Sequence, residues 1–361
     1  MIHIVIGTKA QLIKMAPIMK ILKMRGAEYN YISTGQHKET INDILQNFEI
    51  KEPDHTIYSG KDITSVFQMM IWSAKLLFYT VLNKKKIFKN DKNGIVLVHG
   101  DTVSTLVGAI MAKLSGLKVG HVESGLRSFN LFQPFPEELV RVLVFRLSDY
   151  MFCPGDWAIE NLKKYKGLKI NTEINTLYDS LKFALPAITS IADIQIPDYE
   201  YGIVTIHRFE NLRNISSFNK IVHAVKRISE KHKLIFILHK PTEIKLKKYG
   251  LYQKLKDDPN IELRNRYDYF NFIKLIIHSR FVVSDGGSNQ EECYYLGKPV
   301  ILLRNVTERQ EGLGRNAVLS YFDDNILDNF INDLDSYKFD FLKLDKSPSD
   351  IVIDACKDFV N

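Results

Sequence analysis

VHGDTVSTLVGAIMAKLSGLKVGHVESGLRSFNLFQPFPEELVR, residues 98–141, is the stretch around which the fold is organised. Short apolar runs at Ile95–His99 and Lys118–Val122 predict buried strands, and the helix-like segment between them completes a βαβ unit. Ligands of such sheets gather at the carboxyl ends of the strands. Acidic side chains that follow a strand end or a Pro/Gly turn favour acid–base chemistry there, and this stretch has three of them: Asp101, Glu123 and Glu137.

Strands alternate with helix-like segments on both sides of this stretch. The further predicted strands are Ile2–Ile6, Tyr29–Ser33, Asp149–Cys153, Gly202–Ile206, Leu234–His239, Ile261–Leu263, Phe281–Ser284 and Val300–Leu303. The pattern loosens over residues 171–199, which are the predicted domain boundary. Asn175, Thr176 and Asp179 lead one short predicted helix there, and Pro186 and Pro197 follow it. We therefore expect an α/β protein with two consecutive doubly wound lobes, residues 1–175 and 176–345, and an active site in the cleft between them.

The composition is that of an ordinary globular protein, with 45% hydrophobic and 25% charged residues. The net charge of +7 comes mainly from scattered lysines, so a ligand bearing phosphates explains it as well as nucleic acid does. The three cysteines form no CxxC pair, which favours a reducing, cytoplasmic compartment: Cys153, Cys293 and Cys356. Because the sequence starts directly on a strand, no signal peptide is expected.

The segment Ile63–Leu82 is apolar enough to be weighed as a membrane span. Polar residues interrupt it, including Gln68 and Lys75, and Asp62 stands at its start. A buried or subunit-facing helix is therefore the prediction, and its aromatic and methionine content could also mark a dimer surface.

Two turns from a strand into a helix are candidate anion sites, because helix N-termini offer backbone N–H groups and a positive dipole end. The first is Gly7-Thr8-Lys9, with Lys14 one turn further along, and it lacks the GxGxxG pattern of a dinucleotide site. The second is Asp285-Gly286-Gly287-Ser288, followed by Glu292. Gln36 and His37 are further donors, in the loop after Tyr29–Ser33.

One phosphate-binding turn in each lobe, with carboxylates and a histidine, suits a nucleoside-diphosphate sugar. Removal of a weakly acidic ring proton and expulsion of a diphosphate need a base, an acid and a cationic clamp. Clustering of Asp101, Glu123 and Glu137 would raise the pKa of the base towards neutrality. His207 and Arg208, at a strand end of the second lobe, could stabilise the departing diphosphate.

Each of these residues also has a structural explanation. Asp101 could cap the following helix, Glu123 could belong to a turn, and Glu137 could stabilise a helix N-terminus after Pro136. His239 could be an ordinary loop residue. The Asp333-Leu334-Asp335 triplet resembles a metal-binding motif but lies on a polar segment, so no metal site is predicted.

Nine motifs in order resemble the UDP-N-acetylglucosamine 2-epimerase family, in its non-hydrolysing branch. They extend from residue 7 to residue 312 and read GTKAQLIKMAP, TGQH, HGDTVST, HVESGLRS, PFPEELVR, VTIHRFEN, DGGSNQEE, LGKPV and TERQEG. The resemblance implies two Rossmann-like lobes of the glycosyltransferase-B type, with a C-terminal helix (346–361) that returns to the first lobe. It further implies a cytoplasmic homodimer that needs no metal or redox cofactor.

The resemblance also implies a mechanism, in which anti elimination of UDP gives a 2-acetamidoglucal and re-addition inverts C2. It assigns the catalytic roles to Asp101, Glu123, Glu137 and His207, without fixing which carboxylate is the base. It assigns the UDP contacts to six residues: Lys14, Arg141, His239, Phe272, Glu292 and Arg309. The two turns add Lys9, Gly287 and Ser288 to this set. A second, activating UDP-sugar would contact Gln36, His37, Glu137 and Arg208.

Several loops depart from the family pattern. Lys9 and Gln11 stand where the family usually has Arg and Glu, and Gln11 is similar to the relatives that act on UDP-2,3-diacetamido-glucuronic acid. Gly286 and Phe209 replace a usual Ser and Arg. The hypothesis is a UDP-HexNAc 2-epimerase for surface polysaccharide synthesis, with an altered sugar possible. The alternatives are a glycosyltransferase, a hydrolysing 2-epimerase and a non-catalytic UDP-sugar-binding protein.

Overall fold

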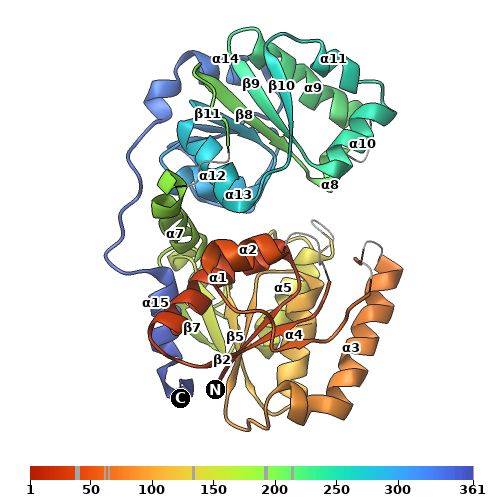
Figure 1. Ribbon diagram of the computed structural model, residues 1–361, viewed down its shortest axis with the longest axis vertical. Coiled ribbons are helices and arrows are strands. Elements are labelled where there is room, and N and C mark those ends of the chain that lie inside the picture. The colour runs from red at the N-terminus through yellow and green to blue at the C-terminus, as the bar shows by residue number, and fades with distance from the viewer. Residues whose placement is uncertain are drawn as a thin grey trace. The chain divides into compact units, whose positions relative to one another are not determined.

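The computed structural model describes residues 1–36, 41–60, 62–63, 66–131, 135–190, 194–212 and 215–360. The chain divides into two compact units, each built on its own parallel sheet with flanking helices (Figure 1). Unit 1 comprises Met1–Phe183 and Leu344–Asn361, and unit 2 comprises Ala184–Lys343. The chain passes from unit 1 to unit 2 inside helix α7 (Leu177–Ser190).

Unit 1 contains, among its described residues, a seven-stranded parallel sheet in the order β3-β2-β1-β4-β5-β6-β7. The order reverses between β1 and β4, so the carboxyl ends of these two strands define the crevice where ligands bind in doubly wound sheets. The strands are β1 (Ile2–Ile6), β2 (Tyr29–Ser33), β3 (His55–Thr56), β4 (Ile95–His99), β5 (Lys118–Val122), β6 (Tyr150–Cys153) and β7 (Leu168–Asn171).

Helices cover both faces of this sheet, which is why its central strands are continuous apolar runs. α3, α4 and α5 pack side by side on one face, while α1 packs with α2 and α15. Arg25, the C-cap residue of α1, pairs with Asp350 and Asp354 of α15, which attaches the C-terminal helix to the rest of unit 1. The helices of unit 1 that lie wholly within it are α1 (Lys9–Met24), α2 (Ile41–Phe48), α3 (Val66–Ile87), α4 (Val103–Leu114), α5 (Glu137–Leu147), α6 (Asp156–Asn161) and α15 (Pro348–Ala355). A 3-10 turn, Lys357–Phe359, follows α15.

Unit 2 repeats the architecture with six parallel strands among its described residues, in the order β10-β9-β8-β11-β12-β13. Its reversal point lies between β8 and β11. The strands are β8 (Tyr201–Ile206), β9 (Lys233–Leu238), β10 (Ile261–Asn265), β11 (Phe281–Ser284), β12 (Val300–Leu302) and β13 (Ala317–Leu319). The helices are α8 (Phe209–Leu212), α9 (Ile215–Ser229), α10 (Lys240–Lys248), α11 (Tyr252–Lys256), α12 (Tyr269–His278), α13 (Gly287–Tyr295), α14 (Asp324–Asn332) and the 3-10 helix Leu334–Tyr337.

The predicted α/β class with two doubly wound sheets is confirmed. The short helix predicted within residues 171–199 is α7, but it is longer than expected because it continues through Pro186. Pro186 lies inside this helix, where a proline costs about 3 kcal/mol. A buried stripe at helical spacing offsets that cost: Leu177, Leu181, Ala184 and Ile188. Residues 66–82 of the apolar segment predicted from Ile63 lie in α3, and across the described part of the chain no helix is long and apolar enough to span a membrane.

Three buried histidines of unit 1 predict a loss of stability in mild acid. Burial lowers the pKa of His3 to about 4, of His99 to about 3 and of His121 to about 4. An unfolded chain protonates histidine near pH ~6.5, so the unfolded state binds more protons between that pH and about 4. The free energy of unfolding should therefore fall as the pH falls through this window, by up to about 1.4 kcal/mol per pH unit for each histidine.

Urea unfolding measured between neutral pH and about pH 4.5 tests this expectation. His3→Gln removes one titrating group and should reduce the slope by up to about a third. An unfolding free energy that stays constant across the window would contradict the assignment of neutral, buried imidazoles.

Candidate active site

The turn after β1 is packed so tightly that only glycine fits at position 7. A Cβ on Gly7 would lie 1.9 Å from Ser104 Oγ and 2.4 Å from Thr34 Oγ1. These two hydroxyls lie 2.9 Å apart, and Ser104 also donates to Gln36 Oε1 at 2.6 Å. The ends of β1 and β2 and the start of α4 therefore meet at the reversal point of the sheet.

The buried Gln11 side chain ties this turn to the end of β4. Its Oε1 accepts from the backbone N–H groups of Gly7 (2.9 Å) and Thr8 (3.1 Å). Its Nε2 donates to the His99 carbonyl at 2.7 Å and to Thr105 Oγ1 at 2.9 Å. The prediction that the first turn offers free N–H groups to a phosphate is thus wrong for Gly7 and Thr8, because Gln11 in a capping box already takes both.

Glu123 is held at the end of β5 by a buried network. Lys14 Nζ and Asn175 Nδ2 each lie 2.6 Å from its Oε1, and His99 Nε2 lies 3.5 Å from its Oε2. Glu123 has a positive φ of 64°, and its Oε2 lies 3.2 Å from where a Cβ on Gly100 would be. The carboxylate is therefore fixed against the turn that carries Asp101.

Asp101 is held by Arg141 of α5, whose Nη2 and Nε lie 2.5 Å and 3.0 Å from its Oδ2. Arg141 is positioned in turn by the fully buried Glu138, at 3.2 Å, which also binds Arg127 at 2.5 Å. Burial would raise the pKa of Glu138, but the Ser128 N–H and the two arginines outweigh it and hold the pKa below its usual value.

The sequence predicted a cluster of like-charged carboxylates, and the structure adds a buried cation beside two of them, Asp101 and Glu123. Each is bound to its own buried cation, Arg141 and Lys14 respectively. The result is an alternation of charges at the ends of β4 and β5, in which the two cations also become candidates for binding an anionic leaving group.

Three of the other predicted residues of unit 1 lie at helix starts or in a loop. Glu137 is the first residue of α5 and is half-buried, and Lys9 is half-buried at the start of α1. Gln36 is buried against Ser104. His37 lies outside the described residues.

In unit 2 the buried Asp285 at the end of β11 organises the end of β8. Its carboxylate accepts from the backbone N–H groups of His207 and Arg208, each at 3.0 Å, and from Asn211 Nδ2 at 2.9 Å. The ring Nδ1 of His207 lies 3.6 Å from the same carboxylate. Asp285 thus joins the two strand ends at the reversal point and fixes the backbone that carries His207.

The imidazole of His207 lies against the backbone of Gly286, which has no side chain. Its ring stacks on His239 with centroids 4.9 Å apart, and His239 Nε2 is 3.2 Å from Thr205 Oγ1. A Cβ on Gly286 would lie 2.6 Å from His207 Cε1. Glycine at 286 therefore allows the imidazole to occupy this place.

Two arginines lie over Gly287, the first residue of α13. A Cβ there would be 2.7 Å from Arg309 Nε and 3.5 Å from Arg208 Nη2. The amino end of α13 carries partial positive charge as well, so backbone and side chains together form an anion site. The adjacent Ser288 is half-buried.

The residues predicted for the nucleoside lie on α12 and α13. Glu292 is buried on α13, where it accepts from Asn289 Nδ2 at 2.9 Å. Phe272 is half-buried on α12, one turn after Tyr269. Burial raises the pKa of the Tyr269 phenol well above its usual value, and the neighbouring Glu292 adds to the effect.

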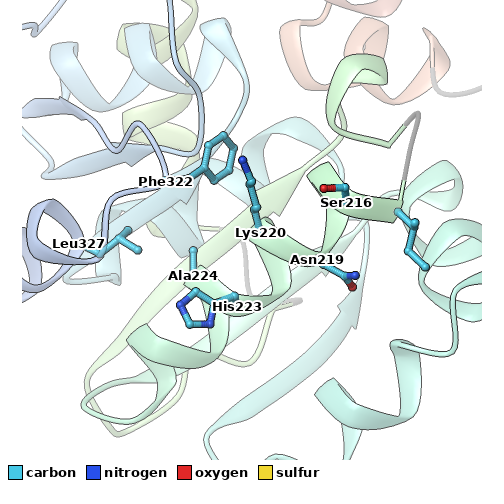
Figure 2. Close-up of a pocket in the computed structure, with 8 residues that line it drawn as sticks. Ser216, Asn219, Lys220, His223, Ala224, Phe322 and Leu327 are labelled. Carbon is cyan, nitrogen blue, oxygen red and sulfur yellow. The ribbon is translucent and has the colours of Figure 1, made fainter.

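A hollow of about 500 Å³ on unit 2 lies elsewhere, between α9 and the segment that leads into α14 (Figure 2). Its polar residues are engaged locally: His223 lies 3.1 Å from Asp324, and the Lys220 ammonium lies 6.0 Å from the centroid of the Phe322 ring. The hollow contains none of the predicted site residues and is explained by the packing of two amphipathic helices. It is lined by Ile215, Ser216, Asn219, Lys220, His223, Ala224, Phe322 and Leu327.

Comparisons with known proteins agree with this architecture. The profile of a family described as UDP-N-acetylglucosamine 2-epimerase matches residues 20–338. The chain is 32% identical over 333 residues to the UDP-N-acetylglucosamine 2-epimerase of Methanococcus maripaludis, covering 88% of this chain and 86% of that protein. The crystal structure of the Neisseria meningitidis UDP-GlcNAc 2-epimerase bound to UDP-GlcNAc superposes with a TM-score of 0.83 at 27% identity, covering 99% of both chains. The Methanocaldococcus jannaschii enzyme with UDP-GlcNAc and UDP gives 0.79, also at 27% identity and 99% coverage of both chains.

Proposed function

The chain belongs to the UDP-N-acetylglucosamine 2-epimerase family, and we propose that it inverts C2 of a UDP-2-acetamido sugar. It is an isomerase, and the substrate class follows from the relatives, two of which were crystallised with UDP-GlcNAc. The proposed reaction converts UDP-GlcNAc, or a relative modified elsewhere on the ring, into the corresponding UDP-ManNAc-type sugar.

The observation that carries the proposal is the placement of carboxylates among cations at the ends of β4 and β5. In the elimination, a carboxylate takes the C2 proton, the C2–H electron pair forms the C1=C2 double bond, and UDP leaves with the C1–O pair. Asp101, Glu123 and Glu137 are the proposed acid–base groups. UDP is then re-added while a proton is delivered to the opposite face of C2, so protons and electrons balance without a redox cofactor.

The anion site of unit 2 is proposed to hold the leaving group. Arg208, Arg309 and the N–H groups at the start of α13 would bind the diphosphate, whose negative charge grows as the C1–O bond breaks. Glu292 would accept from the ribose hydroxyls and Phe272 would pack on the uracil. His207, whose backbone N–H is fixed by Asp285, is proposed to contact the diphosphate at the moment of departure.

Product analysis separates this proposal from the alternatives. The purified protein is incubated with UDP-GlcNAc, and the products are resolved by chromatography and NMR. An equilibrium mixture of the two UDP-sugars supports the non-hydrolysing epimerase. Free ManNAc together with UDP would indicate the hydrolysing reaction. Transfer of the sugar to an acceptor would indicate a glycosyltransferase. Unchanged substrate with measurable binding would indicate a non-catalytic protein. If UDP-GlcNAc itself is inert, C3-, C4- and C6-modified UDP-sugars are tested in the same way.

The cellular role proposed here follows from the chemistry of the product. A nucleoside-diphosphate sugar is an activated donor, the form from which glycosyltransferases assemble surface polysaccharides. A reducing, cytoplasmic location is proposed because the three cysteines are buried free thiols: Cys153, Cys293 and Cys356.

We also propose that the exposed apolar face of α3 binds a second copy of the chain. Met70, Phe78 and Leu82 are each 67% exposed on this helix. Single exposed apolar side chains are common on protein surfaces, whereas several on one helix indicate an interaction surface. Phe78→Asp should convert a dimer into monomers, as measured by sedimentation equilibrium at micromolar concentration. Ile244→Asp, an equally apolar exposed site on α10, is the matched control and should leave the assembly unchanged. A wild-type protein that sediments as a monomer would refute the proposal.

A further inference from the structure

The arginines at Gly287 are each held from behind by a buried carboxylate. Arg309 Nη1 lies 2.5 Å from Glu291 Oε1, and Arg208 Nη2 lies 2.8 Å from Glu308 Oε1. Each guanidinium group near the start of α13 is therefore paired with a carboxylate of the same unit.

Glu308 binds two arginines at once. Its second oxygen, Oε2, lies 3.2 Å from Nη2 of Arg304, whose side chain is itself buried. Burial would raise the pKa of Glu308, but the charges of Arg208, Arg304 and Arg309 outweigh it and hold the pKa far below its usual value. An ionised carboxylate has no proton to donate, so Glu308 has nothing to offer a phosphate directly.

We propose that Glu308 is a positioning residue for the diphosphate: it fixes Arg208 over Gly287 so that the guanidinium is in place before the nucleotide binds. The inference deepens the proposed function, because it assumes that the anion at Gly287 is the diphosphate of a UDP-sugar.

The physical reason is preorganisation. A free arginine side chain has many rotamers, and a ligand that must select one of them binds more weakly. Glu308 selects the rotamer of Arg208 in advance, and Arg304 offsets the negative charge that would otherwise repel the phosphates. The arrangement leaves the cluster of Arg208, Arg304, Arg309, Glu291 and Glu308 with a surplus of positive charge.

A double-mutant cycle on UDP affinity tests this inference. By isothermal titration calorimetry, Glu308→Gln should weaken UDP binding about tenfold, because the amide cannot bind two guanidinium groups. In an Arg208→Ala background the same substitution should have no further effect, since the residue it acts through is gone. In steady-state assays KM for the UDP-sugar should rise more than kcat falls.

Asp328→Asn is the matched control, because it removes a carboxylate from another arginine of unit 2, Arg227, at 2.6 Å. It should leave UDP affinity unchanged. If Glu308→Gln does not fold, Glu308→Asp, which keeps the charge on a shorter side chain, takes its place in the cycle and should give a smaller, still Arg208-dependent loss.

Equal losses of affinity in the wild-type and Arg208→Ala backgrounds would overturn the inference, and so would unchanged or tighter binding by Glu308→Gln. These outcomes are distinct from failure of the proposed function. If the proposed function failed, the wild-type protein would neither bind UDP nor exchange the C2 proton of any UDP-sugar, and the residue at position 308 would make no difference.

Discussion

Glu123→Gln is expected to lower the epimerisation rate by about a thousandfold or more, the range typical of an acid–base group. Glutamine keeps the shape and can still accept from Asn175 Nδ2, but it can neither take a proton nor neutralise Lys14. The rate is measured from the approach to equilibrium between the two UDP-sugars, and UDP binding, measured separately, should persist.

The same substitution should also destabilise unit 1, because it leaves Lys14 as a buried charge without its partner. Removing one member of a buried ion pair costs about 3–5 kcal/mol. Lys14→Met combined with Glu123→Gln should recover most of that stability while activity stays lost, which separates folding from chemistry.

Glu49→Gln is the surface counterpart, since the exposed Glu49 pairs at 3.1 Å with Lys20, which lies on α1 like Lys14. It should change the unfolding free energy by less than about 1 kcal/mol and leave the rate unchanged. A Glu123→Gln protein with wild-type turnover would show that the acid–base groups lie elsewhere.

Gly286→Ala is expected to reduce kcat by about a hundredfold with little change in melting temperature. The backbone at 286 has φ −90°, which any residue adopts, so the effect is steric. The new methyl group would lie 2.6 Å from His207 Cε1 and 2.7 Å from Asn289 Oδ1, so the imidazole must leave its place against the turn. A displacement of about 1 Å at a reacting group can cost about this much in rate.

Gly250→Ala should give the opposite pattern. Gly250 has φ +68° with no atom within 4 Å of an added Cβ, so alanine there should cost about 1 kcal/mol of stability and no activity. A Gly286→Ala enzyme with unchanged kcat would mean that His207 does not need the position it occupies here.

Most of the fold was predictable because parallel sheets buried on both faces leave a strong signature in sequence. The apolar runs at Ile2–Ile6, Ile95–His99 and Phe281–Ser284 coincide with β1, β4 and β11. The missed strands β3, β7 and β13 have two, four and three residues, lie at sheet edges and contain partly exposed residues, so none gives a long apolar run. The length of α7 was underestimated because Pro186 resembles a turn signal, whereas burial of one face decides the structure.

The candidate site was predictable in its strand-end positions but not in its charge pairing. Partners far apart in sequence, such as Lys14 and Glu123, become neighbours only once the strand order is known. Asn175, Glu138 and Glu308 were therefore missed as supporting residues, although motifs that carry the resemblance contain the last two. Nothing in the structure explains why Gly286 stands here in place of the usual serine.

Solvent exchange at C2 is the most direct test of the central claim. The protein is incubated with a UDP-2-acetamido sugar in deuterium oxide, and proton NMR and mass spectrometry follow the C2 position. The proposed mechanism predicts loss of the C2 proton signal and a gain of one mass unit in both epimers, with no exchange by the Glu123→Gln protein. Formation of product without deuterium at C2, or no exchange with any sugar of the class, would contradict it.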